Sequence, residues 1–394
     1  MLPARVLRLL VVMLDPLSAI LRKGEIVPRY YNPTDLFDEI HFLLLSDDRP
    51  VPDELKQLCG RGLPVIHNLV PPRQMILRSL GWRPFRLRPF AARAVELARS
   101  IAPSAVRSLN PWLDGFVAAE IKARLGIPFV LSLHGNMDED YRNQARPEGG
   151  LPGYVHVHCA RTMERHVLQS ADAVICVYRF IEPYARKFGA RRIETIYNAV
   201  ASDAITVKQD YRLSQPPRLI LPGRQLPQKD PRPILRALAR IPGPVIDLIG
   251  SGPVHHELPR LAQELGIAER CRFFASMQNA ELCRSLAGYD LLLSVNNYGG
   301  VSKVELEAAF AGMPIITNRH PLEREPELLG GNCVVVEHDV DAWAAAIQDL
   351  LRDHARRERL GRTLRASVEP YAGPLMERRQ GELYASLMGM TAPS

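Results

Sequence analysis

The sequence predicts an α/β protein built from two Rossmann-like, doubly wound domains. Its 394 residues exceed the ~250–300 residues at which a single hydrophobic core stops growing, so two domains are expected. Short runs rich in Val, Ile and Leu alternate with longer segments of helical period, which is the pattern of parallel strands joined by crossover helices. Between Ala201 and Pro217 the chain is polar and ends in two prolines, which suits a linker between the domains.

Six apolar runs in each half are the expected strands. In the first half they are Val6–Met13, Ile40–Leu45, Pro64–His67, Phe129–His134, Ala173–Val177 and Arg192–Tyr197. In the second half they are Leu219–Pro222, Val245–Ile249, Arg272–Phe274, Leu291–Val295, Pro314–Thr317 and Cys333–Val336. The expected division is a first domain over 1–200, a linker over 201–217 and a second domain over 218–373. A ligand is expected in a cleft between the two, because the loops at the carboxyl ends of parallel strands form such sites.

Composition and charge exclude several classes of protein. Hydrophobic residues make up 46% and charged residues 24% of the chain, a balance that excludes a disordered, collagen-like or disulfide-scaffold protein. The net charge is +7, and all of it lies in residues 1–200, which hold 27 bases and 20 acids against 23 of each in the remainder. This asymmetry predicts an anionic partner on the first domain. The excess is too small for a nucleic-acid-coating protein, and no nucleic-acid-binding module is recognised, so no nucleic-acid partner is expected.

One basic segment accounts for the charge of the first half. From Leu55 to Val95 there is no acid, and eight bases occur: Lys56, Arg61, Arg73, Arg78, Arg83, Arg86, Arg88 and Arg93. Aromatic residues such as Phe85 are interleaved with them. Arg83, Arg86 and Arg88 are therefore candidates for contact with an acceptor or an anionic membrane surface. A helix–loop–helix with its arginines in water remains the alternative.

The cysteines and the first apolar run indicate the compartment. Six cysteines occur without a Cys-x-x-Cys pair, which is typical of reduced thiols in a cytoplasmic protein. Val6–Leu14 contains Arg8 and has no small-residue cleavage site, so it is too short and too interrupted for a signal peptide or a membrane-spanning helix. We expect a cytoplasmic location, and peripheral contact with the inner face of the membrane is a further candidate.

The second half opens with two cations at the end of a strand. Leu219–Pro222 is followed by Gly223, Arg224 and, five residues later, Lys229, just before a helix opened by prolines. Arginine offers a planar fork and a helix start adds backbone donors, so the pair suits a diphosphate group. Two solvated loop cations are the alternative interpretation.

Two glycine-rich turns follow at later strand ends. Val245–Ile249 ends in Gly250, Ser251, Gly252 and Pro253, a turn that permits close approach by a ligand or simply a tight strand-to-helix connection. After Leu291–Val295 come Gly299, Gly300, Val301 and Ser302, then a helix that carries Glu307. Glycines before a helix present free amides to a polar ligand, and a carboxylate two turns later suits a sugar diol.

Taken together, these motifs resemble the family 4 glycosyltransferases of group 1, retaining enzymes of the GT-B fold that use nucleotide-activated sugars. The resemblance implies that Arg224 and Lys229 hold the donor diphosphate, with a catalytic role, and that Glu307 binds the ribose. Gly250, Ser251 and Gly252 would lie near the nucleoside, and Gly299, Gly300, Val301 and Ser302 near the sugar and phosphate. In the first half His134, in the run 130–136, matches a histidine near the transferred sugar, and 197–200 matches the stretch that closes the first domain. The helix over 374–394 would return to the first domain.

The sequence departs from this family at one position. The family usually has a Glu eight positions before the ribose-binding Glu, and Gly299 stands there. Asn296, Asn297 and Lys303 are the nearest polar residues to replace it. The departure leaves open a catalytically silent sugar-nucleotide-binding or partner-binding protein, while an epimerase or a phosphorylase-like enzyme is the rival among enzymes. The donor is expected to be a UDP- or GDP-sugar, and neither a cofactor nor a metal held by protein ligands is expected.

Overall fold

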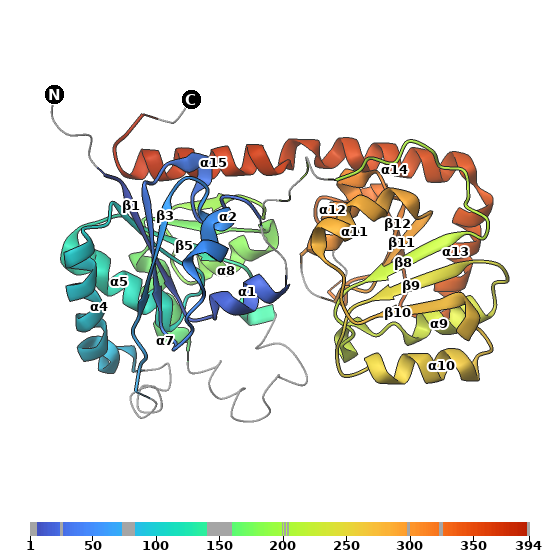
Figure 1. Ribbon diagram of the computed structural model, residues 1–394, viewed down its shortest axis with the longest axis horizontal. Helices are drawn as coiled ribbons and strands as arrows, with labels where there is room; N and C mark the ends of the chain where they lie inside the picture. Colours follow the sequence, from blue (N-terminus) through green and yellow to red (C-terminus); the bar gives the residue numbers. More distant parts are fainter. Residues whose placement is uncertain are drawn as a thin grey trace. The chain divides into compact units, whose positions relative to one another are not determined.

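The structure is a computed structural model that describes residues 6–23, 27–72, 83–139, 160–198, 200, 202, 205–297, 300–322 and 326–391. The chain forms two compact units. Unit 1 comprises Met1–Ala199 together with Gly373–Ser394, and unit 2 comprises Val200–Ala372. Each unit contains one parallel sheet with helices packed against it (Figure 1), so the predicted α/β class with two doubly wound domains is confirmed.

The sheet of unit 1 has seven parallel strands in the order β3-β2-β1-β4-β5-β6-β7. Their bounds are β1 Arg8–Met13, β2 Glu39–Leu44, β3 Leu63–Asn68, β4 Ala105–Ser108, β5 Phe129–Leu133, β6 Ala173–Cys176 and β7 Ile193–Thr195. Six of these lie where the apolar runs predict them. β4 has no counterpart among the predicted runs, because it is four residues long and contains Arg107 and Ser108. These residues are typical of loops, but both are buried in the centre of the sheet.

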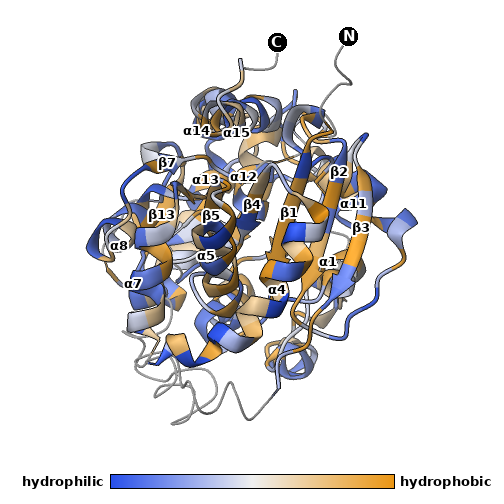
Figure 2. Cartoon of the chain, turned by 90° about the vertical axis from the view of Figure 1, so that its left-hand side faces the viewer, coloured by the Kyte–Doolittle hydropathy of each residue, from blue (hydrophilic) through white to orange (hydrophobic). Residues whose placement is uncertain are grey.

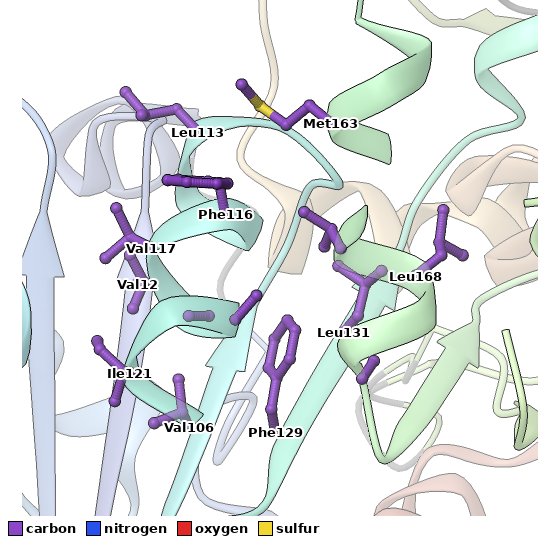
Figure 3. Packing of buried hydrophobic residues seen from close by; sticks show 14 of the residues in the cluster. Val12, Val106, Leu113, Phe116, Val117, Ile121, Phe129, Leu131, Met163 and Leu168 are labelled. Carbon is purple, nitrogen blue, oxygen red and sulfur yellow. The ribbon is translucent and has the colours of Figure 1, made fainter. Parts of the chain in front are cut away.

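Both faces of this sheet are buried, and one of them carries a large hydrophobic cluster. Helices α4 (Arg88–Ile101), α5 (Leu113–Leu125) and α7 (Arg161–Ser170) cover it. Phe116 and Val117 of α5 pack among residues of the strands and of α7, including Val12 and Leu131 (Figure 3). The strands themselves are predominantly apolar, as the orange colour of β1 and β2 in Figure 2 shows. The opposite face carries Arg107 and Ser132, beside the segment 27–32 that follows α1 (Leu17–Lys23).

The last helix of the chain, α15 (Gly373–Leu387), belongs to unit 1. Glu377 accepts hydrogen bonds from Arg29 Nη2 at 3.0 Å and from the Thr34 amide at 2.7 Å. The ring of Tyr384 meets that of Phe37 edge to face, with centroids 5.4 Å apart. These contacts anchor α15 to the segment that leads into β2.

The sheet of unit 2 has six parallel strands in the order β10-β9-β8-β11-β12-β13. Their bounds are β8 Arg218–Pro222, β9 Val245–Ile249, β10 Cys271–Phe274, β11 Leu291–Ser294, β12 Ile315–Asn318 and β13 Val334–Val336. All six lie at the runs that predict them, because most residues of each run are apolar, although β10 and β13 are only partly buried. The helices of this unit are α9 Arg232–Ala239, α10 Leu258–Glu264, α11 Asn279–Ser285, α12 Lys303–Ala311, α13 Val340–Arg352 and α14 His354–Val368.

The segment before β8 packs against the rest of unit 2. Lys208 is 8% exposed and donates to the carbonyl oxygens of Ala287 and Tyr289. The Tyr211 hydroxyl donates to the Gly312 carbonyl at 2.9 Å, and Arg357 donates to the Tyr211 carbonyl. The part of the predicted linker from residue 205 onward is thus held by specific bonds.

The strand orders fix where a ligand is expected in each unit. In unit 1 the connections diverge between β1 and β4, and in unit 2 they diverge between β8 and β11. Loops at the carboxyl ends of two such strands separate, and the crevice that results is the usual ligand site of an open parallel sheet. In unit 2 the two loops are those that carry Arg224 and Gly300.

Candidate functional site

Arg224 and Lys229 follow β8 at the point where the strand order of unit 2 diverges. Arg224 is exposed and Lys229 is half-buried. Burial lowers the pKa of Lys229, Glu305 opposes that shift, and Arg224 adds to it. Lys229 therefore lies within electrostatic reach of both residues, so the loop after β8 and the start of α12, which carries Glu305, lie close together. Arg224 and Lys229 bring two cations to the loop after β8, and this charge suits a diphosphate.

The two glycines after β9 make room for the loop that carries Arg224. A Cβ at Gly250, where φ is +138°, would lie 2.0 Å from the Gly223 carbonyl oxygen, and one at Gly252 would lie 2.2 Å from that of Gln225. The loops are also hydrogen-bonded, since the Gln225 amide donates to the Ser251 carbonyl at 3.0 Å. Glycine is needed here because backbone packs directly on backbone. Whether a nucleoside also contacts Gly250, Ser251 and Gly252 remains a prediction.

The start of α12 is fixed by a capping box. The Ser302 side chain accepts from the Glu305 amide, and the Glu305 carboxylate accepts from the Ser302 amide at 2.7 Å. Glu305 is 2% exposed and also accepts from Thr317 Oγ1 at 3.0 Å and from Asn296 Nδ2 at 3.2 Å. Both polar groups of Ser302 are thus used inside the protein. Glu305 is therefore a buried carboxylate that holds the preceding loop in place.

Glu307 is the second buried carboxylate of α12, with 1% of its surface exposed. Its Oε1 accepts from Asn279 Nδ2 at 2.8 Å and lies 3.7 Å from Lys303 Nζ. Burial, and next the negative charge of Glu307, raise the pKa of the neighbouring Cys283 thiol to about 12. Asn279 and Lys303 hold the carboxylate in a defined orientation, as recognition of a diol requires.

The loop before α12 contains the departure from the family pattern. Gly299 lies outside the described residues, whereas Gly300, Val301 and Ser302 precede the first turn of α12. Asn296 donates through Nδ2 to the Gly300 carbonyl at 2.6 Å, and Asn318 donates to Asn297 Oδ1 at 2.7 Å. Both asparagines, considered as replacements for the missing Glu, make hydrogen bonds that shape this loop.

His134 directly follows β5, at the carboxyl end of the unit 1 sheet. Its Nε2 lies 3.1 Å from the Tyr30 hydroxyl. His134 is one of the exposed residues of unit 1. Desolvation of its imidazole, with a smaller effect of the Arg107 charge, lowers the pKa of His134 to about 4. The imidazole is therefore neutral near pH 7 and can orient or polarise a hydroxyl group.

Arg107 and Tyr30 are the residues near His134 that sequence reasoning missed. Arg107 is 3% exposed, donates through Nε to Ser132 Oγ at 3.1 Å and through Nη1 to the Tyr30 carbonyl at 3.0 Å, and lies over the Tyr30 ring. Among the described residues no carboxylate lies within salt-bridge distance of its guanidinium. A burial pattern could have signalled Arg107, but only once β4 was recognised as a strand.

The basic segment is described in part, since Arg73–Trp82 lies outside the described residues. Phe85 is 48% exposed, and the Arg88 guanidinium lies 4.6 Å from its ring centroid and 3.3 Å from Glu120. Arg83 and Arg86 occupy the short helical turn around Phe85. In the part of the chain that the structure covers, no helix is long and apolar enough to cross a membrane, and no cluster of three or more His, Cys, Asp or Glu side chains could hold a metal ion.

Two family models match consecutive parts of the chain. The model of Glycosyltransferase Family 4 matches residues 38–204, and that of Glycosyl transferases group 1 matches residues 205–366. The boundary between the two matches lies within five residues of the boundary between unit 1 and unit 2. Arg224, Lys229 and Glu307 all fall in the second match.

Similar proteins act on sugars. A GDP-mannose-dependent alpha-(1-6)-phosphatidylinositol monomannoside mannosyltransferase of Mycolicibacterium smegmatis is 29% identical over 55% of this chain and 63% of its own length. A D-inositol 3-phosphate glycosyltransferase of Mycobacterium marinum is 35% identical over 34% of this chain and 30% of its own length. The matched parts thus span less than two thirds of either relative.

Solved structures of the same fold cover nearly all of the chain. Anabaena HepE in complex with UDP superposes with a TM-score of 0.70 at 16% identity, over 96% of this chain and 100% of its own. A sucrose-phosphate synthase from Thermosynechococcus elongatus gives 0.70 at 17% identity, over 97% and 99%. At these identities the likeness establishes the fold, which is the expected GT-B architecture.

Proposed function

The chain belongs to the group 1 glycosyltransferases, and from that membership we propose that it transfers a sugar from a nucleoside diphosphate sugar to a hydroxyl group of an acceptor. The observation that carries the proposal is the start of α12 in unit 2. There a buried, oriented carboxylate, Glu307, lies on the same helix as Glu305, which caps the N-terminus of that helix and acts electrostatically on Lys229. A ribose and a diphosphate are the two parts of a sugar nucleotide that need these two groups.

Each part of the donor has a proposed partner. Glu307 would accept hydrogen bonds from the two ribose hydroxyls, because an ionised carboxylate has two oxygens that can accept several hydrogen bonds. Arg224 would bind the diphosphate with its planar fork, and Lys229 would add a compact charge. As the bond between the sugar carbon and the phosphate oxygen breaks, negative charge grows on the leaving group, and these cations stabilise it.

We infer that the reaction proceeds with retention. The acceptor hydroxyl would attack the sugar carbon from the face that the diphosphate leaves, and its proton would pass to the departing phosphate oxygen. His134 would orient the sugar or polarise a hydroxyl as a neutral group. The motifs shared with the family support this reading, and a stereochemical analysis of the product by NMR tests it.

The donor base and the acceptor are proposed only as classes. One relative is named for GDP-mannose and one similar structure holds UDP, so a UDP- or GDP-sugar is proposed. The acceptor would be a glycan, a lipid-linked sugar or a small molecule bound mainly by unit 1. Phosphatidylinositol mannosides and inositol phosphate, which the relatives' names mention, are both anionic, and the basic segment Lys56–Arg93 suits such an acceptor or a peripheral contact at the inner membrane face. A cytoplasmic location is proposed on the same grounds.

A catalytically silent sugar-nucleotide-binding protein is the second candidate. Gly299 favours it, since the family's usual Glu is absent at that position. Calorimetric titration with UDP and GDP, a thermal-shift screen of nucleotide sugars, and assays of donor hydrolysis and transfer separate the two. A ligand at 100 times its Kd raises the stability of the folded state by about 2.7 kcal/mol. Binding with turnover supports the transferase, binding without turnover supports the silent protein, and no nucleotide binding refutes both.

A further inference from the structure

His134 Nε2 has a hydrogen-bond partner, and further residues hold that partner in place. The Tyr30 hydroxyl lies 3.1 Å from Nε2. Tyr30 is itself held by Arg107, which donates to the Tyr30 carbonyl at 3.0 Å and has its guanidinium carbon 5.0 Å from the ring centroid. Ser132 in turn fixes Arg107 through Nε. A buried cation, a phenol and an imidazole thus form one connected chain.

The direction of the hydrogen bond between Tyr30 and His134 follows from the groups around it. The Tyr30 hydroxyl forms its hydrogen bond with His134 Nε2, whereas Arg107 donates to the Tyr30 carbonyl and lies over the ring. A phenol has one proton to donate, and Nε2 is the side-chain acceptor within its reach. Burial raises the pKa of Tyr30 despite the opposing effect of Arg107, so the phenol keeps that proton at neutral pH.

We propose that Tyr30 and Arg107 are positioning residues that fix His134 as the neutral tautomer with its proton on Nδ1 and with Nε2 accepting from the Tyr30 hydroxyl. In this state Nδ1 offers a hydrogen-bond donor to a sugar or acceptor oxygen, and Nε2 is not available as a general base. The inference rests on the proposed function for its consequence in catalysis. The tautomer itself depends only on residues of unit 1.

The charges near His134 support a neutral ring. Arg107 lies on β4, and Tyr30 and Tyr31 lie in the segment before β2. Tyr384 lies on α15, and the pKa of Tyr384 is influenced by both Arg107 and Tyr30. Asp15, after β1, acts on Tyr31. The charge that acts on His134 is that of Arg107, which opposes protonation of the ring.

Nitrogen NMR of the imidazole in the ligand-free protein tests the tautomer directly, with the signals of His134 assigned by their loss in His134→Gln. The expected result is a protonated Nδ1 and an unprotonated Nε2 that stays neutral to about pH 4. In Tyr30→Phe the stabilising bond to the neutral form is lost, so the pKa of His134 should rise by roughly 0.5–1 pH unit. Arg107→Gln should raise it as well, because a nearby positive charge is removed.

Tyr31→Phe is the matched control, since the Tyr31 hydroxyl is buried and makes no hydrogen bond with any described residue. Its spectrum and titration at His134 should equal those of the wild type. A proton on Nε2 in the wild type overturns the proposal whatever the variants do, and so does an unchanged titration in a folded Tyr30→Phe. Because no sugar is present, a failure of transferase activity would refute the proposed function without altering this result.

Discussion

Replacement of Glu307 by Gln separates recognition of the nucleotide from stability of the fold. The side chain keeps its shape, and the amide oxygen can still accept from Asn279, as Oε1 does at 2.8 Å. The negative charge is lost, and one acceptor oxygen becomes a donor. A ribose diol that met two charged acceptor atoms would then meet one neutral acceptor.

The expected loss of affinity is large. A hydrogen bond to a charged group contributes about 1.5–3 kcal/mol, so losing one and weakening the other costs about 2–3 kcal/mol. At 1.4 kcal/mol per factor of ten, this corresponds to a roughly 30- to 150-fold rise in the Kd for UDP or GDP. Calorimetric titration of the wild type and Glu307→Gln with each nucleotide measures it, and the free energy of unfolding should change little.

Glu305→Gln is the matched control on the same helix, two residues away. Glu305 accepts from the Ser302 amide, Asn296 Nδ2 and Thr317 Oγ1, so an amide nitrogen in its place leaves at least one buried donor unpaired. We expect a loss of about 1–3 kcal/mol in the free energy of unfolding and a lower melting temperature. If Glu307→Gln binds nucleotides as the wild type does, or if it destabilises the protein as much as Glu305→Gln, the assignment of the ribose to Glu307 is refuted.

Three further predictions concern other parts of the molecule. Gly250→Ala should lower the free energy of unfolding by about 3 kcal/mol and weaken nucleotide binding, because its Cβ would lie 2.0 Å from the Gly223 carbonyl oxygen. Gly331→Ala is the control, since a Cβ at Gly331 would have no atom within 4 Å. Equal melting temperatures for the two variants would contradict the packing argument. Burial and the neighbouring His41, 3.0 Å away, lower the pKa of His67. Below about pH 6.5 the unfolded state therefore binds more protons than the folded state. The free energy of unfolding should decline as pH falls, and in denaturant titrations at pH 5 and 7 this decline should be smaller for His67→Gln. Joint replacement of Arg83, Arg86 and Arg88 by Gln should reduce sedimentation with anionic liposomes or the affinity for an anionic acceptor, while the Kd for UDP and GDP stays unchanged. Arg260→Gln is the control. A fall in nucleotide affinity would instead place the basic segment in the donor site.

Most of the sheet structure followed from local composition. Strands such as β9 and β12 are buried on both faces, so their sequences are continuous apolar runs that stand out against polar loops. The same runs placed Arg224 next to the end of β8 and Glu307 on the helix that follows β11, near the loops that a parallel sheet exposes to ligands. The one strand missed, β4, shows the limit of that signal, because Arg107 and Ser108 give it the composition of a loop.

Hydrophobic periodicity and spacing along the chain were enough to predict the fold class and the strand positions of unit 2, and to propose residues for a diphosphate and a diol. The folded chain was needed to show how two neighbouring carboxylates are held: Glu305 by Ser302 and Thr317, and Glu307 by Asn279, 28 residues earlier. It also decided that Gly250 accommodates the loop after β8, and that Arg107 and Tyr30 meet at His134. Contacts between residues far apart in the chain depend on strand order and register, and neither leaves a local pattern in the sequence.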